Sequence, residues 1–223
     1  MKEFQIIELK EGVFERNNIE AHHLRMRLHE EKTFFLNLMG SPGAGKTTLL
    51  IKTIDTIKDE MKIAVMEADI DSDIDAAAIS KTGVGVIQLH TGGMCHLDAE
   101  MTRQGIDGLG AEDADLIILE NVGNLVCPAE FDTGATLNAM ILSVPEGDDK
   151  PLKYPLMFRI SDVLIISKID ALSVFDFDMD VCTHRVRDIN PHIEIFSVSA
   201  KTGEGMDAWI DWLRNEVRSQ RRE

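Results

Sequence analysis

Residues 40–48, Gly-Ser-Pro-Gly-Ala-Gly-Lys-Thr-Thr, follow directly on the apolar run FFLNLM at 34–39. They fit the pattern G-x-x-x-x-G-K-[ST], and a strand before that pattern with a helix after it is the context of a phosphate-binding loop. The glycines let backbone N–H groups turn toward the phosphates, and the helix N-terminus adds the positive end of its dipole. Such a match arises by chance in roughly 1 chain of this length in 100. We therefore predict that a nucleoside triphosphate binds here; the alternative is a merely tight glycine-rich turn.

Each residue of this predicted loop has a place at the phosphates. The expected nucleotide contacts are Gly40, Ser41, Pro42, Gly43, Ala44, Gly45, Lys46, Thr47 and Thr48. Lys46 would reach the β and γ phosphates, which makes it a candidate catalytic group, and the Thr47 hydroxyl would ligate Mg²⁺.

Short apolar runs recur along the chain and alternate with amphipathic segments. The runs lie at 34–39, 62–67, 84–89, 115–120, 140–146, 163–168 and 193–198. Helices are expected between and after them, including 46–59, 75–82, 97–107 and 205–219. Because the runs are too short for helices, this alternation predicts βαβ units. We expect an α/β protein with a three-layer P-loop NTPase fold, in which helices flank a mostly parallel central sheet.

Two further segments lie outside that alternation. The charged segment 13–32 predicts an extra N-terminal helix, and its three histidines, His22, His23 and His29, are expected on a solvated face rather than in a metal-binding tract. The acidic segment 145–151 predicts a mobile loop. At 223 residues we expect a single P-loop domain over 1–223, with 1–32 as an N-terminal strand and helix extension.

Composition argues against several classes of function. With 23 basic and 39 acidic residues the net charge is −16, so nucleic acid and anionic membranes, which need a basic face, are not expected as partners. No apolar run approaches the roughly 20 residues of a membrane span. The acidic N-terminus does not fit a signal peptide, and three cysteines are the wrong number for a disulfide framework. We expect a cytoplasmic protein.

Two short elements late in the chain point to the base. Ser167-Lys168-Ile169-Asp170, after an apolar run, resembles the Asn-Lys-x-Asp element by which GTPases recognise guanine, with Ser in place of Asn. In that element the aspartate accepts from the ring N1 and exocyclic N2 donors, which adenine lacks. Ser199-Ala200-Lys201 resembles the element whose backbone N–H donates to guanine O6. Together they favour a GTP-binding role for these segments. The alternative is a purely structural role, in which a strand end is followed by a helix cap at Asp170.

Hydrolysis requires an acid near Mg²⁺ and a group that orients water. Glu120 ends the apolar run 115–120 and is predicted either to contact Mg²⁺ through water or to act as a structural partner of Lys46. Residues 69–75 include four aspartates, which is more than one Mg²⁺ uses, so most of them are expected to belong to a solvated loop. Strand-end acids here resemble a GTPase class whose first switch follows the second strand. That resemblance implies Asp75 as the residue that orients water and Asp69 as an outer-sphere Mg²⁺ contact.

A cysteine–histidine pair follows another strand. TGGMCHLDAEM (91–101) follows the run 84–89, and NVGNLVCPAEF (121–131) follows 115–120. Both segments leave parallel strands at the edge of the phosphate loop, so Cys95, His96 and Cys127 are expected to lie together. The dipole of helix 97–107 is predicted to lower the pKa of Cys95. Thiolate and imidazole suit Zn²⁺, Ni²⁺ or Co²⁺. The alternatives are a redox thiol and small buried core cysteines, as is expected for Cys182.

These residues fall short of a closed four-coordinate site in one chain. The site is therefore either open, or a second subunit supplies ligands across a two-fold axis.

The motifs GSPGAGKTT, TGGMCHLDAEM, ENVGNLVCPAEFD and SKID together resemble the hydrogenase nickel-incorporation GTPases, from about residue 20 to the end. The resemblance implies GTP hydrolysis with Mg²⁺, and a Ni²⁺ or Zn²⁺ site of Cys95, His96 and Cys127 at the interface of a GTP-dependent homodimer. It implies hydrogenase maturation proteins or the hydrogenase large subunit as partners. The alternatives are a urease or cobalamin-enzyme accessory GTPase, a P-loop small-molecule kinase, and a metal store or redox switch with residual GTPase activity.

Overall fold

The computed structural model describes residues 9–70 and 72–222. Within them, seven strands form one sheet in the order β3-β2-β4-β1-β5-β6-β7, and every pair is parallel. The strands are β1 (Phe34–Gly40), β2 (Ile63–Asp69), β3 (Gly85–His90), β4 (Leu116–Glu120), β5 (Leu137–Ser143), β6 (Val163–Ser167) and β7 (Glu194–Ser197).

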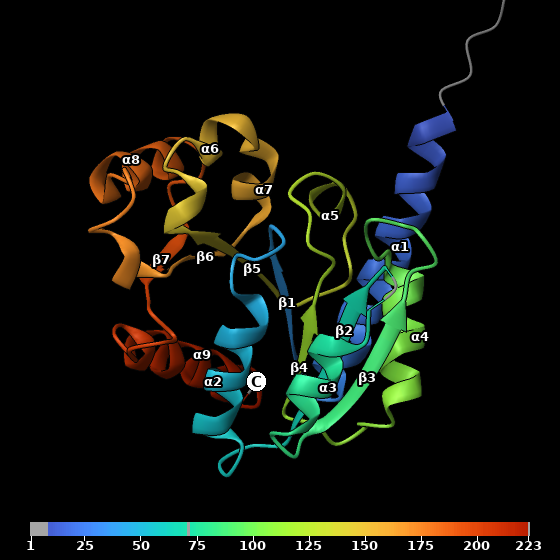
Figure 1. Ribbon diagram of the computed structural model, residues 1–223. Coiled ribbons are helices and arrows are strands. Elements are labelled where there is room, and N and C mark those ends of the chain that lie inside the picture. The colour runs from blue at the N-terminus through green and yellow to red at the C-terminus, as the bar shows by residue number, and fades with distance from the viewer. Residues whose placement is uncertain (1–8, 71, 223) are drawn as a thin grey trace, which may run out of the picture.

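Helices cover both faces of this sheet (Figure 1). They are α1 (Leu9–Glu30), α2 (Lys46–Ile57), α3 (Ile74–Ser80), α4 (Ala99–Leu109), α5 (Cys127–Glu130), α6 (Lys150–Lys153), α7 (Pro155–Ile160), α8 (Met179–Ile189) and α9 (Met206–Gln220). Two 3₁₀ turns, η1 (Val144–Glu146) and η2 (Ile169–Ala171), follow strands. The three-layer α/β fold and the N-terminal helix predicted from the sequence are confirmed.

The central strand β1 shows how the layers are made. Phe34, Leu36 and Leu38 pack in one apolar cluster with residues of α2 and α9. Phe35 points to the other face and packs with residues of α1 and α4. Because both faces are covered, the strand is a continuous apolar run rather than an alternation of apolar and polar residues.

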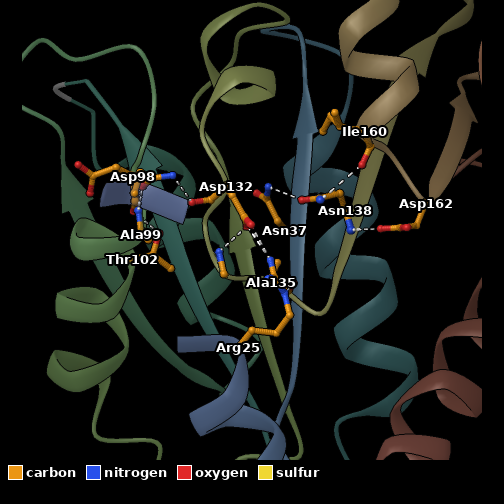
Figure 2. Close-up of polar contacts among 12 residues, drawn as sticks. Arg25, Asn37, Asp98, Ala99, Thr102, Asp132, Ala135, Asn138, Ile160 and Asp162 are labelled. Atoms are coloured by element: carbon orange, nitrogen blue, oxygen red, sulfur yellow. Dashed lines mark hydrogen bonds and ion pairs between the residues drawn. The ribbon is translucent and has the colours of Figure 1, made fainter. Parts of the chain in front are cut away.

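Asn37 interrupts that run in the middle of β1 and is 1% exposed. Its amide donates to Asn138 Oδ1 at 2.9 Å and accepts from Asn121 Nδ2 at 3.0 Å. The Asn138 backbone N–H in turn donates to Asp162 at 2.8 Å (Figure 2). Buried amides need such partners, and these join β1 to β5 and to the residue that follows β4. The loop that carries Cys127 therefore starts from a fixed point.

Two expectations about local structure need correction, and a third is not tested. The segment 145–151 is largely ordered: η1 forms behind a capping box of Ser143 and Glu146, and α6 starts at Lys150. The helix expected at 97–107 begins later, at Ala99, because Asp98 accepts from Met101 N and caps it. The strand expected within 1–32 is not found among the described residues of that segment. Residues 1–8 lie outside the described part of the chain.

Candidate functional site

The phosphate loop joins β1 to α2 and depends on its glycines. Gly43 and Gly45 adopt φ of +74° and +100°, a region that favours glycine. A Cβ on Gly40 would lie 2.7 Å from the Ile141 carbonyl oxygen, so glycine is also required where the loop passes β5. Lys46 is 8% exposed, and its Nζ donates to the carbonyls of Gly40 and Ser41 at 3.4 and 3.3 Å. Burial lowers the pKa of the Lys46 amine.

Two buried carboxylates lie beside this loop. Glu67 of β2 and Glu120 of β4 are register partners on adjacent strands. Glu120 Oε1 accepts from the Thr47 hydroxyl at 2.7 Å, and its carboxylate also attracts the Lys46 amine. Burial raises the pKa of each carboxyl to about 7. Glu67 was not among the residues chosen from the sequence, although its place at the end of the run 62–67 was the available signal.

The same corner fits a hard divalent cation. Among the described residues, Oε2 of Glu67 and Oε2 of Glu120 are buried without a hydrogen-bond partner. Unsatisfied carboxylate oxygens beside a hydroxyl are the donor set that Mg²⁺ prefers. Thr47, Glu120 and Asp69, the residues predicted for Mg²⁺, line one pocket of about 470 Å³ with the phosphate loop.

The acidic segment after β2 is placed in part. Asp69 lies at the end of β2, where its Oδ1 accepts from Ser72 N at 2.8 Å. Asp75 lies in the first turn of α3, is exposed, and lines the phosphate pocket. Asp73 is also exposed, in line with a solvated loop. Asp71 lies outside the described residues.

A second pocket, of about 250 Å³, lies where the guanine ring was expected. Lys168 crosses the phosphate loop, and its Nζ donates to the Gly43 carbonyl at 2.6 Å. Ser167, which replaces the usual Asn, donates to the Ala44 carbonyl at 2.7 Å and so still ties this strand end to the loop.

The polar wall of the second pocket comes from Asp170 and the segment after β7. Asp170 accepts from the Ser199 hydroxyl at 2.7 Å, which lowers the pKa of the carboxyl. Lys201 Nζ lies 3.7 Å from Asp170 Oδ2, and Ala200 lines the same pocket. An ionised carboxylate is purely an acceptor, as recognition of the guanine N1 and N2 donors requires.

The structure brings Cys95, His96 and Cys127 together, although β2 separates the strands that precede them. One ligand atom from each lies within 4.8 Å of the others. The Sγ atoms of Cys95 and Cys127 are 2.8 Å apart, and both cysteines are free thiols. His96 Nδ1 is buried and has no hydrogen-bond partner among the described residues. Burial lowers the pKa of His96, which favours the neutral imidazole that binds metals.

The prediction that a helix dipole lowers the pKa of Cys95 is wrong. The hydrogen bond with Cys127 raises the pKa of this thiol, with burial as a smaller cause. The helix begins only at Ala99, and dipole effects fade within about one turn. A metal ion would therefore displace a proton from Cys95 on binding.

One loop joins the phosphate and metal sites. Gly40 forms an isolated bridge with Asn124, and a Cβ on Gly123 would lie 2.9 Å from Pro42. The Asn124 amide donates to the Cys95 carbonyl at 3.3 Å. The chain between Glu120 and Cys127 thus contacts both the phosphate loop and the other metal-binding segment.

The remaining cysteine and histidines lie elsewhere. Cys182 is fully buried in the core, and burial raises the pKa of its thiol to about 12. His184 is exposed, as are the α1 histidines, His22, His23 and His29. The burial of Cys182 and the exposure of the α1 histidines agree with their interpretation as a core residue and a solvated helix face.

The chain is similar to several known proteins. The family model described as CobW/HypB/UreG, nucleotide-binding domain, matches residues 34–197. Hydrogenase maturation factor HypB of Escherichia coli K12 is 44% identical over 216 residues, which are 97% of this chain and 74% of that protein.

Two solved structures are similar over nearly their whole length. The crystal structure of HypB from Archaeoglobus fulgidus has a TM-score of 0.85 at 36% identity, and covers 91% of this chain and 99% of that one. The crystal structure of HypB from Helicobacter pylori in complex with nickel has a TM-score of 0.86 at 40% identity, and covers 92% and 96%. Among the described residues, none of the helices has the length and apolarity that crossing a membrane requires.

The three thiols are expected to differ in reactivity. Cys95 and Cys127 are half-buried, whereas Cys182 is buried with a pKa of about 12. Alkylation of the folded protein near neutral pH should modify the first two, and Cys182 on the order of 100-fold more slowly. Peptide mass spectrometry measures the rates, with unfolded protein as the control in which all three react. Zn²⁺ should protect Cys95 and Cys127 together; protection of neither would contradict the metal site.

Proposed function

Because the chain belongs to the CobW/HypB/UreG family of nucleotide-binding domains, and within it to the HypB hydrogenase maturation factors, we propose that it is a GTP-hydrolysing nickel metallochaperone. It would bind Ni²⁺ or Zn²⁺ with Cys95, His96 and Cys127 and assist nickel insertion into [NiFe]-hydrogenase. Its partners would be other maturation proteins or the hydrogenase large subunit. The observation that carries the proposal is the convergence of these ligand atoms within 4.8 Å, beside the phosphate loop.

The metal is cargo in this proposal. Two thiols and an imidazole suit borderline-soft ions, and the Helicobacter pylori relative crystallised in complex with nickel. Two thiolates about 2.3 Å from one tetrahedral ion lie about 3.8 Å apart, so loading moves the sulfurs apart by roughly 1 Å from their 2.8 Å contact. Small loop movements would therefore accompany binding and release.

A second copy of the chain is proposed to complete the site. Exposed apolar side chains flank the phosphate pocket and both metal-binding loops: Ile70, Ile74, Met94 and Val126. Apolar surface beside an incomplete ligand set supports a two-fold interface, in which each ligand meets its copy. GTP would favour this dimer if its γ-phosphate orders the segments that carry these residues.

The nucleotide is proposed to be GTP with Mg²⁺. Asp170, held ionised by Ser199, supports guanine recognition, and the orphaned oxygens of Glu67 and Glu120 support the cation. Thr47, Glu120 and Asp69 would hold Mg²⁺, which would neutralise charge on the phosphates. Lys46 would bind the β and γ phosphates, and Asp75 would orient the attacking water.

Nucleotide and metal sites are proposed to be coupled through Asn124. Its backbone pairs with Gly40 at the phosphate loop, and its side chain holds the Cys95 carbonyl. Any shift of the phosphate loop on GTP binding would move this asparagine and hence the Cys95 loop. Thermodynamic linkage requires that the nucleotide and the metal change each other's affinity by the same factor.

Metal binding and dimer formation test the main proposal. We expect metal binding and a shift toward dimer with a non-hydrolysable GTP analogue, and weaker binding with GDP. Cys95→Ala should lower Ni²⁺ and Zn²⁺ affinity by at least about 100-fold, because it removes a ligand. Metal analysis and light scattering measure stoichiometry and mass, with His184→Ala as the exposed-histidine control. Equal metal affinity with GDP and the analogue would contradict the proposed coupling. Metal binding unaffected by Cys95→Ala would contradict the proposed metal site.

Base specificity has its own test at Asp170. Asp170→Asn exchanges an acceptor-only group for an amide, so GTP affinity should fall about 100-fold. XTP, whose C2 oxygen accepts from an amide, should bind better to the variant than to the wild type. Titration calorimetry measures both, with the exposed Asp176→Asn as control. Unchanged GTP affinity in Asp170→Asn would contradict the guanine assignment.

Hydrolysis is tested at Asp75. Asp75→Ala should lower GTP turnover about 100-fold and leave GTP affinity nearly unchanged, because the residue would act on water rather than on the nucleotide. Asp73→Ala is the matched control, since Asp73 is exposed on the same segment. Phosphate release under single-turnover conditions gives the rate. Wild-type turnover in Asp75→Ala would exclude this residue from the reaction.

A further inference from the structure

Helix α1 is attached firmly to the body of the protein along its second half. Leu24 and Leu28 are buried in an apolar cluster that includes Leu97 and Ala135. A neighbouring side chain, Arg25, donates to both carboxylate oxygens of Asp132 at 2.7 and 2.9 Å, and to the Ala135 carbonyl at 2.8 Å (Figure 2). These contacts do not involve the metal ligands, so they keep α1 in place when residues nearer its start are changed.

Asn17 lies on α1 nearer its start than Leu24 and Arg25. It bridges the two segments that carry the metal ligands. Its side-chain oxygen accepts from Ala99 N at 2.8 Å, in the segment that follows His96. Its side-chain nitrogen donates to the Asp132 carbonyl at 2.9 Å, in the segment that follows Cys127. The residue is 8% exposed. An amide supplies a donor and an acceptor in fixed geometry, so Asn17 sets the distance between the two backbones.

An aromatic stack makes a second connection between the same segments. The ring of Phe131, on the Cys127 side, stacks on the imidazole of His96 with centroids 3.9 Å apart and an angle of 19°. Phe14 of α1 packs against Phe131 with centroids 5.1 Å apart. Helix α1 therefore contacts the Cys127 segment through the Phe14 ring as well as through the Asn17 amide, and the Phe131 ring in turn contacts His96.

The stack is a contact that can orient the imidazole. Metal-binding histidines are normally held by a hydrogen bond from the ring nitrogen that does not bind the metal. His96 Nδ1 has no hydrogen-bond partner among the described residues, so it is available as the ligand atom. The Phe131 ring contacts the face of the imidazole and restricts its rotation whichever nitrogen binds the metal.

We propose that Asn17 and Phe131 are positioning residues of the metal site, through which α1 sets the spacing of its two loops and the orientation of His96. Asn17 fixes the spacing, and Phe131 fixes the ring. Together they determine how tightly, and with what coordination geometry, the site binds a thiolate-seeking divalent cation. The inference rests on the proposed metal site and adds to it residues that are not ligands.

Co²⁺ is the probe for the test, because its visible bands report coordination number and thiolate ligation. Asn17→Leu removes both hydrogen bonds at similar volume, and Asn17→Asp keeps the acceptor but loses the donor. We expect Asn17→Leu to bind Co²⁺ about 10- to 100-fold more weakly, with shifted d–d bands, and Asn17→Asp to lie between it and the wild type. Asn18→Leu, at an exposed neighbour on the same helix, should behave as wild type.

Phe131 is tested by a pair of variants. Phe131→Leu should weaken Co²⁺ binding and alter the d–d bands, whereas Phe131→Tyr keeps the ring face and should restore both. If the substitutions merely loosen the fold, they should lower the melting temperature of all variants without changing the bands of bound Co²⁺. Circular dichroism and thermal melts are therefore measured on the same samples. If Asn17→Leu does not fold, the comparison is made with Asn17→Asp and the two Phe131 variants.

The outcomes separate this inference from the proposed function. Wild-type affinity and spectrum in both Asn17→Leu and Phe131→Leu would overturn the positioning role. So would weaker binding that follows lost stability while the bands stay unchanged. If Cys95→Ala binds Co²⁺ as the wild type does, the proposed metal site itself fails; a Cys95-dependent site that ignores Asn17 and Phe131 defeats this inference alone.

Discussion

Parallel pairing of every strand places all the strand carboxyl ends at one edge of the sheet, and the functional residues depend on that constraint. β1 leads into the phosphate loop, and β2 and β4 end in the adjacent Glu67 and Glu120. β3 leads to Cys95, and the segment after β4 leads to Cys127. Residues far apart in the chain therefore meet without long connecting loops.

Charge at this edge explains why the sites need cations. The chain carries a net charge of −16, and the phosphate pocket adds buried acids to a region where anionic phosphates would bind. Desolvation raises the pKa of Glu67 and Glu120 to about 7 and lowers that of Lys46, so burial disfavours the charged form of all three groups. In the proposed function, a divalent cation beside the phosphates would offset the repulsion and would coordinate the carboxylate oxygens that have no hydrogen-bond partner.

Amide side chains, in addition to apolar contacts, hold the metal-binding segments. Asn124 links the Cys95 carbonyl to the phosphate loop, and Asn17 links both segments to α1. Hydrogen bonds are directional, so each amide fixes a position that apolar packing would leave free. Asn37, in β1, fixes where the Cys127 segment leaves the sheet. These contacts support the proposed coupling, in which a ligand at one site would move the other.

The sequence alone determined the fold and the phosphate loop, because each depends on local periodicity or on contiguous residues such as 40–48, whereas the guanine element stays a prediction. It also predicted that Cys95, His96 and Cys127 meet, since strand order within βαβ units is constrained. Only the tertiary structure decided the partners. Glu120 accepts a hydrogen bond from Thr47, Glu67 lies opposite Glu120 on the adjacent strand, and the hydrogen bond that the Cys95 thiol donates to Cys127 raises the Cys95 pKa. It also revealed Asn17 and Phe131, because hydrogen bonds and ring contacts between distant segments depend on packing geometry, which no local pattern encodes.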